Sequence, residues 1–389
     1  MARSRTHWLA LLLASCLCAC TGTVEGEGDA ALRDGGRARA DGSTPTRDGG
    51  EATPDGEVPR DDAGPMADAG PGEGWLRDRY PGDEGIADDP AVLFHDDFEA
   101  GWGRWDRPTA DTRYLHLESG PQAHAGERYL RSTVTVADLA DDMYISSSTH
   151  VRHAPVDEIW WRVHVRFPVL AANPHHWMRF SAGDETWGSS GRANTVPPGD
   201  RGFWFDFDAN TADQFNFYAY WHQMRSGRCN DGSTTPGCDG DQGTTYHYGN
   251  VFRPPDQTPF PRDRWFCVEI HARANTPGVQ DGELSFWIDD APVGDYRPGH
   301  PDGTWLRAQF HTGGCEFSAC TPPAPFEGFD FRTSEDVDFR ELFLDAYYER
   351  DSNRRRREQM EAMGLTVSDE HTILYDDVVI ATERIGCRR

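Results

Sequence analysis

The stretch Trp265–Asp290, W-F-C-V-E-I-H-A-R-A-N-T-P-G-V-Q-D-G-E-L-S-F-W-I-D-D, decides the fold of this chain. Apolar residues take alternate positions in two runs, Phe266–Ile270 and Leu284–Ile288, and the turn signal Asn275–Gly278 lies between them. Successive side chains of a strand point to opposite faces, so each run predicts one apolar face and one polar face. The stretch therefore predicts two strands whose apolar face packs in a core.

Short runs of the same character recur along the chain, separated by clusters of Gly, Pro, Asp and Asn. These runs are Val92–Phe98, Tyr129–Val136, Ile159–Phe167, Gly202–Asp208, Gln214–His222, Trp305–Thr312, Phe339–Tyr347 and Ile373–Ala381. One helix is predicted from Ser352 to Met363, where Gly364 can end it. So many strands with so little helix predict an all-β fold, an antiparallel β-sandwich with one short surface helix.

The N-terminal region is predicted to target and tether the protein rather than to fold. Residues 1–20 resemble a lipoprotein signal peptide, with an apolar run too short to span a bilayer. Cys16 and Cys20 each end a lipobox-like sequence and are the candidate lipidation sites; an unlipidated secretory signal is the alternative. Residues 21–74 contain no aromatic residue, which predicts a disordered tether over 21–75. One domain, 76–389, follows, so we expect an exported bacterial lipoprotein at the outer membrane or cell surface.

Charge and cysteine content narrow the partners and the compartment. The net charge of -27 argues against nucleic acid and against an anionic lipid surface, so membrane contact is expected through the lipid anchor only. All 38 basic residues are arginine, so no lysine can act as a catalytic base. Six cysteines lie in the domain, and an even number in an exported chain predicts disulfides. Proximity favours the pairs Cys229–Cys238 and Cys315–Cys320, which leaves Cys267 for Cys387.

Four of the predicted strands carry polar faces rich in Arg, His, Tyr, Gln and Trp. In chain order these faces present Trp160, Arg162, His164 and Arg166; Asn216, Tyr218, Tyr220 and His222; Glu269, His271 and Arg273; and Trp305, Arg307, Gln309 and His311. Taken together they are the candidate binding surface, and Trp287 supplies a further aromatic ring. The alternative is that these faces are simply solvated.

The Trp265–Asp290 pattern resembles the concanavalin A-like jelly rolls of carbohydrate-active proteins, and within them the alginate and glucuronan lyases. Phe94–Glu99 resembles their first strand and Tyr375–Ala381 their last. Phe217–Gln223, F-Y-A-Y-W-H-Q, resembles the Tyr-x-Tyr-x-His strand of alginate lyase-like enzymes, whose two tyrosines belong to the catalytic site. The resemblance implies a polysaccharide lyase-like jelly roll that acts by β-elimination on an acidic, uronate-containing polysaccharide.

Elimination from a uronate needs a base for the C5 proton, an acid for the leaving O4, and a positive group for the carboxylate. The predicted catalytic residues are Tyr218, Tyr220, His222, Arg162 and His164. The predicted substrate-binding residues are Arg166, Trp160, Asn216, His271, Arg273, Trp287, Arg307, Gln309 and His311. The chain departs from the lyase pattern because it has no lysine, and because Gly202–Asp208 stands where those enzymes have Ser-x-Arg.

Three other interpretations stay open. The missing lysine favours a non-catalytic, lectin-like binding module, and a structural cell-envelope protein is the third class. A glycoside hydrolase is disfavoured, because jelly-roll glucanases usually carry Glu-x-Asp-x-Glu on one strand and this chain has none. The resemblance also implies a structural calcium at Asp97, Glu99 and Asp377, for which plain surface carboxylates are the alternative. No organic cofactor is expected.

Overall fold

The computed structural model describes residues 74–106, 113–184, 194–209, 214–229, 247–254, 260–315 and 320–388. Among these residues, none of the helices is both long enough and apolar enough to cross a membrane. The predicted signal peptide, both candidate lipidation cysteines, Cys238 and all but the last two residues of the predicted tether lie outside the described residues.

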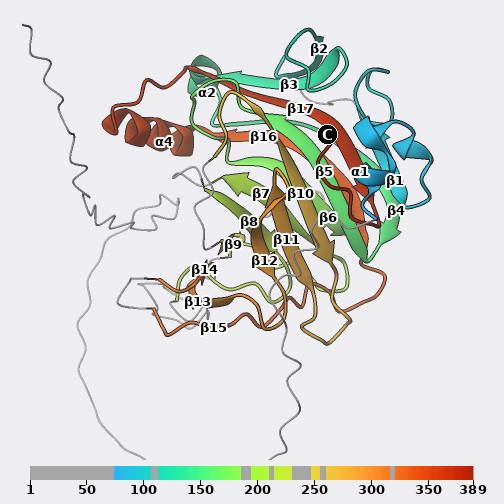
Figure 1. The fold of residues 1–389 in the computed structure, drawn as a ribbon. Coiled ribbons are helices and arrows are strands. Elements are labelled where there is room, and N and C mark those ends of the chain that lie inside the picture. The colour runs from blue at the N-terminus through green and yellow to red at the C-terminus, as the bar shows by residue number, and fades with distance from the viewer. Residues whose placement is uncertain are drawn as a thin grey trace, which may run out of the picture. The chain divides into compact units, whose positions relative to one another are not determined.

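Two large sheets form the domain (Figure 1). The eight-stranded sheet has the order β12-β11-β10-β5-β17-β3-β2, with β1 also paired to β17. Its strands are β1 (Val92–Asp96), β2 (Leu115–Ser119), β3 (Arg128–Thr135), β5 (Glu158–Arg166), β10 (Trp265–Arg273), β11 (Glu283–Ile288), β12 (Ala291–Tyr296) and β17 (Glu370–Ala381).

The nine-stranded sheet has the order β15-β13-β14-β9-β8-β7-β6-β16-β4. Its strands are β4 (Tyr144–Val156), β6 (His176–Gly183), β7 (Gly202–Ala209), β8 (Phe215–Tyr220), β9 (Asn250–Arg253), β13 (Asp302–Leu306), β14 (Gln309–Thr312), β15 (Ala324–Pro325) and β16 (Phe339–Glu349). Neighbouring strands are antiparallel except β14 and β9, which run parallel.

The described helices are short and lie outside the sheets. They are α1 (Leu76–Arg79), the 3-10 turns η1 (Pro81–Asp83) and η2 (Ile86–Asp88), α2 (Val136–Asp141) and α4 (Arg350–Ala362). Thr135 and Asp138 form a capping box at the start of α2. The Glu349 carboxylate accepts the Asp351 backbone N–H at 2.9 Å at the start of α4, which satisfies an otherwise unpaired helical donor. The predicted surface helix is therefore confirmed. It begins at Arg350, two residues before the predicted start at Ser352.

The core between the sheets is largely aromatic. Trp161 of β5 and Phe180 of β6 have ring centroids 4.5 Å apart, and Phe286 of β11 and Phe207 of β7 have centroids 4.8 Å apart. Each pair joins one sheet to the other, and all four side chains are buried. Burial of one such ring contributes about 1.5–3 kcal/mol. The alternating apolar residues of the strands thus supply the contact that makes the two sheets a sandwich.

The all-β sandwich and the paired strands of Trp265–Asp290 are confirmed. β10 and β11 pair antiparallel, with Ile270 opposite Phe286 and both buried. The single strand predicted over Trp305–Thr312 is wrong, because the chain turns at Arg307, where φ is 55°. β13 and β14 form a hairpin there, with Leu306 opposite Gln309. Alternation continued across that turn, so sequence periodicity alone could not reveal it.

The two ends of the described chain cover the outer face of the eight-stranded sheet. Leu76, Ile86 and Ile385 form a small apolar cluster with Val379 and Ala381 of β17. All five side chains are fully buried. Part of this outer face is therefore a second, smaller core rather than a solvated surface.

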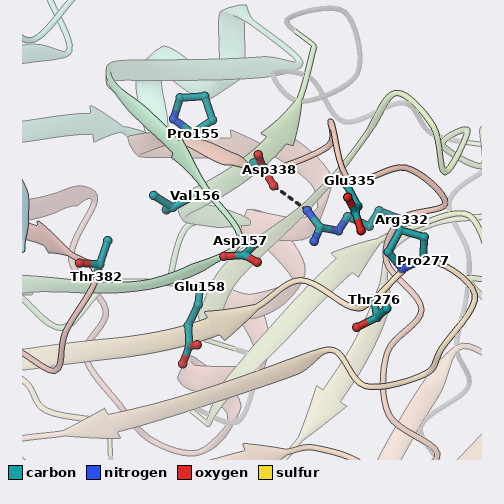
Figure 2. A pocket seen from close by; sticks show the side chains of 10 residues that line it. All are labelled: Pro155, Val156, Asp157, Glu158, Thr276, Pro277, Arg332, Glu335, Asp338 and Thr382. Carbon is teal, nitrogen blue, oxygen red and sulfur yellow. Dashed lines mark hydrogen bonds and ion pairs between the residues drawn. The ribbon is translucent and has the colours of Figure 1, made fainter.

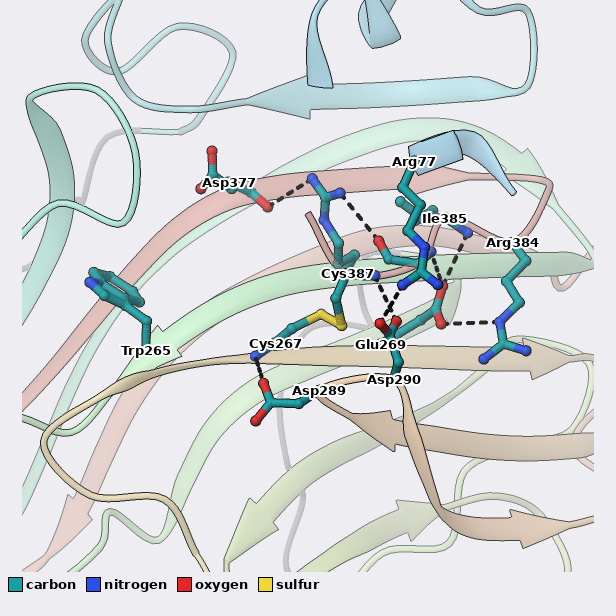
Figure 3. Close-up of a disulfide and its surroundings, with 12 residues drawn as sticks. Arg77, Trp265, Cys267, Glu269, Asp289, Asp290, Asp377, Arg384, Ile385 and Cys387 are labelled. Atoms are coloured by element: carbon teal, nitrogen blue, oxygen red, sulfur yellow. Dashed lines mark hydrogen bonds and ion pairs between the residues drawn. A yellow bond between two sulfur atoms is a disulfide. The ribbon is translucent and has the colours of Figure 1, made fainter. Parts of the chain in front are cut away.

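Glu269 of β10 holds the C-terminal segment in place (Figure 3). One carboxylate oxygen accepts the backbone N–H groups of Ile385 and Gly386 at 3.0 and 2.7 Å, and the other accepts Arg384 Nε at 3.2 Å. Glu269 is fully buried, and charged hydrogen bonds offset the cost of burying its charge. A residue expected on a polar outer face is thus an anchor for the chain end.

Two of the three predicted disulfides are confirmed as pairs. Cys267 bonds Cys387, which ties β10 to the C-terminal segment, and Cys315 bonds Cys320. Cys229 is also disulfide-bonded, while its predicted partner Cys238 lies outside the described residues.

Candidate functional site

The structure divides the candidate binding surface between the two sheets. Tyr218 and Tyr220 lie on β8 of the nine-stranded sheet, with Gln309 and His311 on β14 of the same sheet. The eight-stranded sheet carries Trp160, Arg162, His164, Arg166, His271, Arg273 and Trp287. Alternation gives the face of a strand but not the sheet that the strand joins. The expectation of one shared surface is therefore wrong.

Arg162 is a buried structural residue rather than a catalytic one. It is 0% exposed; its Nη1 donates to Asp83 at 3.0 Å and to the Gly386 carbonyl at 3.3 Å. A guanidinium without exposed surface cannot meet a polymer, so its predicted catalytic role is wrong. His164, two residues along β5, is 3% exposed. Burial holds the pKa of His164 well below its usual range.

The other predicted residues on this sheet take part in ring stacks and ion pairs. The Trp160 ring stacks on His271 with centroids 4.4 Å apart and lies 5.3 Å from the Trp287 ring. Arg166 pairs with Asp263 at 2.8 Å; Arg273 pairs with Glu283; and His271 Nε2 lies 2.9 Å from Glu158. These contacts account for the residues as parts of the sheet, and their predicted role in substrate binding stays a prediction.

A polar row crosses three neighbouring strands on the outer face of the nine-stranded sheet. Arg179 of β6 lies opposite Asp206 of β7, and Asp206 lies opposite Tyr218 of β8. Arg179 Nε donates to Asp206 at 2.7 Å. The Tyr218 hydroxyl lies 3.3 Å from the Tyr220 hydroxyl. Directly opposed side chains of antiparallel strands are close neighbours, so this row brings a cation, a carboxylate and two phenols together.

His176 joins the row through an irregularity in the sheet. Its Nδ1 lies 2.9 Å from Asp208 and 3.7 Å from Asp206, and its ring centroid lies 5.1 Å from that of Tyr218. Strict alternation would place His176 and Arg179, three residues apart, on opposite faces. The pairing of β6 with β16 is irregular here, because its register shifts between Leu344 and Tyr347. As a result the side chains of both His176 and Arg179 reach Asp206. We refer to Arg179, Asp206, Asp208, Tyr218, Tyr220 and His176 as the tyrosine–histidine cluster.

Four of the six residues of this cluster are not among the predicted site residues. Arg179 and His176 lie on β6, which is not among the strands predicted from the sequence. Asp206 and Asp208 lie in the predicted strand Gly202–Asp208, but that strand contributes no residue to the predicted site. The available signal was the alternation in Gly202–Asp208, where Phe203, Phe205 and Phe207 enter the core and leave the aspartates on the outer face.

The surroundings shift the pKa values of this cluster in a consistent way. Burial raises the pKa of Tyr220 to about 12 and raises that of Tyr218 well above its usual value. Burial opposes the charge of His176, but Asp208 and Asp206 outweigh it and raise its pKa above 6.5. Burial also raises the pKa of Asp208 to about 6. For Arg179, Asp206 outweighs burial and raises the pKa. Near neutral pH the cluster thus offers two protonated phenols, one fixed cation and one imidazole whose protonated form is favoured by Asp208 and Asp206.

The remaining predicted residues lie near β8 or further across the same sheet. Asn216 is opposite Asp208 and buried. His222 follows β8, with Nε2 3.4 Å from Asp330. Arg307, Gln309 and His311 belong to the β13–β14 hairpin, which β9 separates from β8. The structure therefore groups Asn216 with the two tyrosines and does not group the β14 residues with them.

The predicted calcium ligands have other contacts. The Glu99 carboxylate accepts the backbone N–H groups of Glu127 and Arg128, each at 2.6 Å. Asp97 accepts the Glu99 backbone N–H at 3.2 Å, and Asp377 contacts His124 and Arg388. A calcium ion bound by all three carboxylates stays a prediction.

A cavity of about 650 Å³ lies away from the tyrosine–histidine cluster (Figure 2). Its lining residues are Pro155, Val156, Asp157, Glu158, Thr276, Pro277, Arg332, Glu335, Asp338 and Thr382. Arg332 donates to Asp338 at 2.6 Å, and the lining holds this one arginine and four carboxylates. An excess of carboxylates disfavours an anionic ligand there.

No protein-family model matches this chain, and no curated protein matches it in sequence. Solved structures do resemble it. Alginate lyase Aly36B is 12% identical with a TM-score of 0.40, covering 77% of this chain and 96% of that chain. An endo-β-1,4-glucuronan lyase from the fungus Trichoderma reesei is 11% identical with a TM-score of 0.41, covering 75% and 96%. The Emp47p carbohydrate recognition domain is 11% identical with a TM-score of 0.30, covering 77% and 99%. Similarities this low carry no argument about the chemistry of this chain.

Proposed function

We propose that the outer face of the nine-stranded sheet binds a uronate-containing polysaccharide and cleaves it by β-elimination at the tyrosine–histidine cluster. The observation that carries this proposal is the row Arg179–Asp206–Tyr218, with the Tyr220 hydroxyl 3.3 Å from that of Tyr218. One small area thus supplies the cation, the proton donor and the base that elimination needs.

The pKa shifts suggest how the roles divide. A phenol is already protonated at neutral pH, and burial raises the pKa of Tyr220 and Tyr218 further, so either suits protonation of the leaving O4. His176 has a pKa above 6.5 and is oriented by Asp208, so its neutral form suits removal of the C5 proton. Arg179 would stabilise the charge that spreads into the uronate carboxylate.

The carboxylates of this face favour a second candidate function. Burial raises the pKa of Asp345 to about 6 and that of Asp208 to about 6, so both are largely ionised above that pH, beside Asp206. Aspartate, histidine and tyrosine also hydrogen-bond sugar hydroxyls, and ionised aspartates oppose a polyanion. A non-catalytic, lectin-like module that binds a less acidic sugar polymer is therefore the alternative.

The proposal extends to the N-terminal region, which the sequence resemblance to a lipobox supports. We propose that Cys20 or Cys16 is lipidated and that residues 21–75 hold the domain away from the membrane. Mass spectrometry of the mature N-terminal peptide tests this, and an unmodified peptide would contradict it.

The test is ultraviolet absorbance during incubation of the protein with alginate, glucuronan and other uronate polymers. Elimination creates an unsaturated uronate, so absorbance should rise with at least one polymer. Tyr220→Phe should lower the rate by about 100-fold or more while polymer binding in a pull-down is retained. Tyr144→Phe is the matched control, because Tyr144 is 57% exposed on β4 of the same sheet. A flat trace with retained polymer binding would support the lectin-like module. A flat trace without polymer binding would support a structural envelope protein.

A further inference from the structure

Two histidines and an aspartate meet on the far side of the sandwich from the tyrosine–histidine cluster. His124, His164 and Asp377 each place one ligand-type atom within 4.8 Å of the others. The two imidazole rings stack with centroids 3.9 Å apart, and His124 Nδ1 contacts Asp377 Oδ2. These three residues are the His-His-Asp cluster.

The buried histidine of this cluster has an unused polar atom. His164 is 3% exposed, and its Nδ1 is buried without a hydrogen-bond partner among the described residues. A buried nitrogen that makes no hydrogen bond is costly, and native structures generally provide a partner. A bound metal ion would supply that partner.

The backbone is shaped to bring Asp377 to the histidines. β17 has a β-bulge at Asp377. Asp376 is opposite His164 and Val379 is opposite Arg162, so two residues of β17, Asp377 and Val378, correspond to the single residue Val163 of β5. Such a bulge re-aims a side chain and is frequent near functional sites. Asp377 also has a φ of 47°, in the left-handed region that residues other than glycine adopt rarely, Asp more often than most.

Neighbouring contacts hold the other members in place. Asp376 accepts the His124 backbone N–H at 2.8 Å, and Trp265 Nε1 donates to the Gln122 carbonyl at 2.9 Å in the same loop. Arg388 holds the second carboxylate oxygen of Asp377, which leaves Oδ2 directed at the histidines. The cluster is thus oriented by a second layer of hydrogen bonds, as in many metal sites.

The cluster opens onto a cavity of about 220 Å³. The cavity is lined by His124, His164, Trp265, Phe266, Cys267, Asp289, Asp290, Cys387 and Arg388, and Figure 3 shows Asp377 and Trp265 beside the disulfide. Two imidazole nitrogens and one carboxylate suit zinc and similar divalent transition metals, whereas calcium prefers ligands that are all oxygen. Three protein ligands next to a cavity leave a coordination position for water or a small ligand.

We propose that His124, His164 and Asp377 bind one divalent transition metal ion of the zinc type. Binding needs His124 Nδ1 without a proton, and a neutral imidazole meets this need when its proton is on Nε2. The site is independent of the proposed lyase chemistry, because it lies on the other sheet.

The test uses the full-length chain, stripped with a chelator and titrated with Zn²⁺ by calorimetry. One ion should bind per chain, and His124→Ala should weaken binding at least about 100-fold. His116→Ala is the matched control. His116 Nε2 also lies 3.0 Å from a carboxylate oxygen, that of Glu118 on the same sheet, but among the described residues no third metal-ligating side chain joins this pair. The Zn²⁺ affinity of the His116→Ala variant should match that of the unmodified chain.

A second readout does not depend on any variant. Co²⁺ added to the unmodified, metal-free chain should give the intense visible absorption of a four- or five-coordinate site with nitrogen and oxygen ligands. The proposal is overturned if Zn²⁺ does not bind with a ratio of one, if His116→Ala loses as much affinity as His124→Ala, or if Ca²⁺ displaces Zn²⁺ at equal concentration.

Discussion

Removal of the Cys267–Cys387 disulfide should strongly destabilise the domain. The bond joins residues 120 apart in sequence. In the chain-entropy treatment, a loop of this length restricts the unfolded chain by about 16 cal/mol/K, or about 5 kcal/mol at 25 °C. The double variant Cys267→Ala/Cys387→Ala should therefore lower the free energy of unfolding by about 5 kcal/mol. Urea unfolding followed by circular dichroism under non-reducing conditions measures this change.

The second disulfide provides a control on the same scale. Cys315 and Cys320 are 5 residues apart, for which the same treatment gives about 7 cal/mol/K, or about 2 kcal/mol. Cys315→Ala/Cys320→Ala should therefore cost about 3 kcal/mol less than the long-loop variant. Equal losses, or a smaller loss for the long loop, would refute the reasoning and show that the hydrogen bonds of Glu269 hold the chain end without help from the disulfide.

Three further predictions concern charge. The elimination rate should rise as the pH passes the pKa of His176, which is raised above 6.5, because the base must be unprotonated. Asp208 is one of the groups that raise this pKa, so Asp208→Asn should move the rising limb of the pH–rate profile to lower pH. Burial raises the pKa of Asp345 from 3.8 to about 6; its ionisation therefore costs stability as pH rises through that range. Asp345→Asn should thus stabilise the fold by about 3 kcal/mol at pH 8 and by little at pH 3 in urea unfolding; a gain at pH 3 alone would contradict this. Arg162→Met removes the nearer cationic partner of the buried Asp83, which keeps Arg388 at 3.8 Å, and should cost about 3–5 kcal/mol by the same assay; a loss under 1 kcal/mol would show that the buried pair is not structural.

Local alternation was sufficient to predict the sandwich. Phe266, Val268 and Ile270 are buried in β10 as their spacing required, because a period of two follows directly from strand geometry. The two confirmed disulfides were likewise predictable, since few pairings were open once the nearest cysteines were matched.

The candidate site could be predicted only in part, because it depends on long-range pairing. Tyr218 and Tyr220 were identified from a local motif, but their neighbours come from β6 and β7 and from a register shift that alternation cannot reveal. Arg162 shows the opposite failure. Its polar face was correctly inferred, yet that face is covered by chain ends whose docking no local pattern encodes.

The most direct test of the proposed function compares one arginine from each sheet. Arg179 and Arg273 are both paired with a carboxylate, Asp206 and Glu283 respectively; the Arg179 side chain is 12% exposed and that of Arg273 is 41% exposed. The ultraviolet absorbance assay, run on the uronate polymer that the unmodified protein cleaves, should show a loss of about 100-fold or more for Arg179→Ala and a rate within about twofold of the unmodified protein for Arg273→Ala. A large loss for Arg273→Ala with Arg179→Ala unaffected, or no elimination by the unmodified protein on any uronate polymer, would contradict the account.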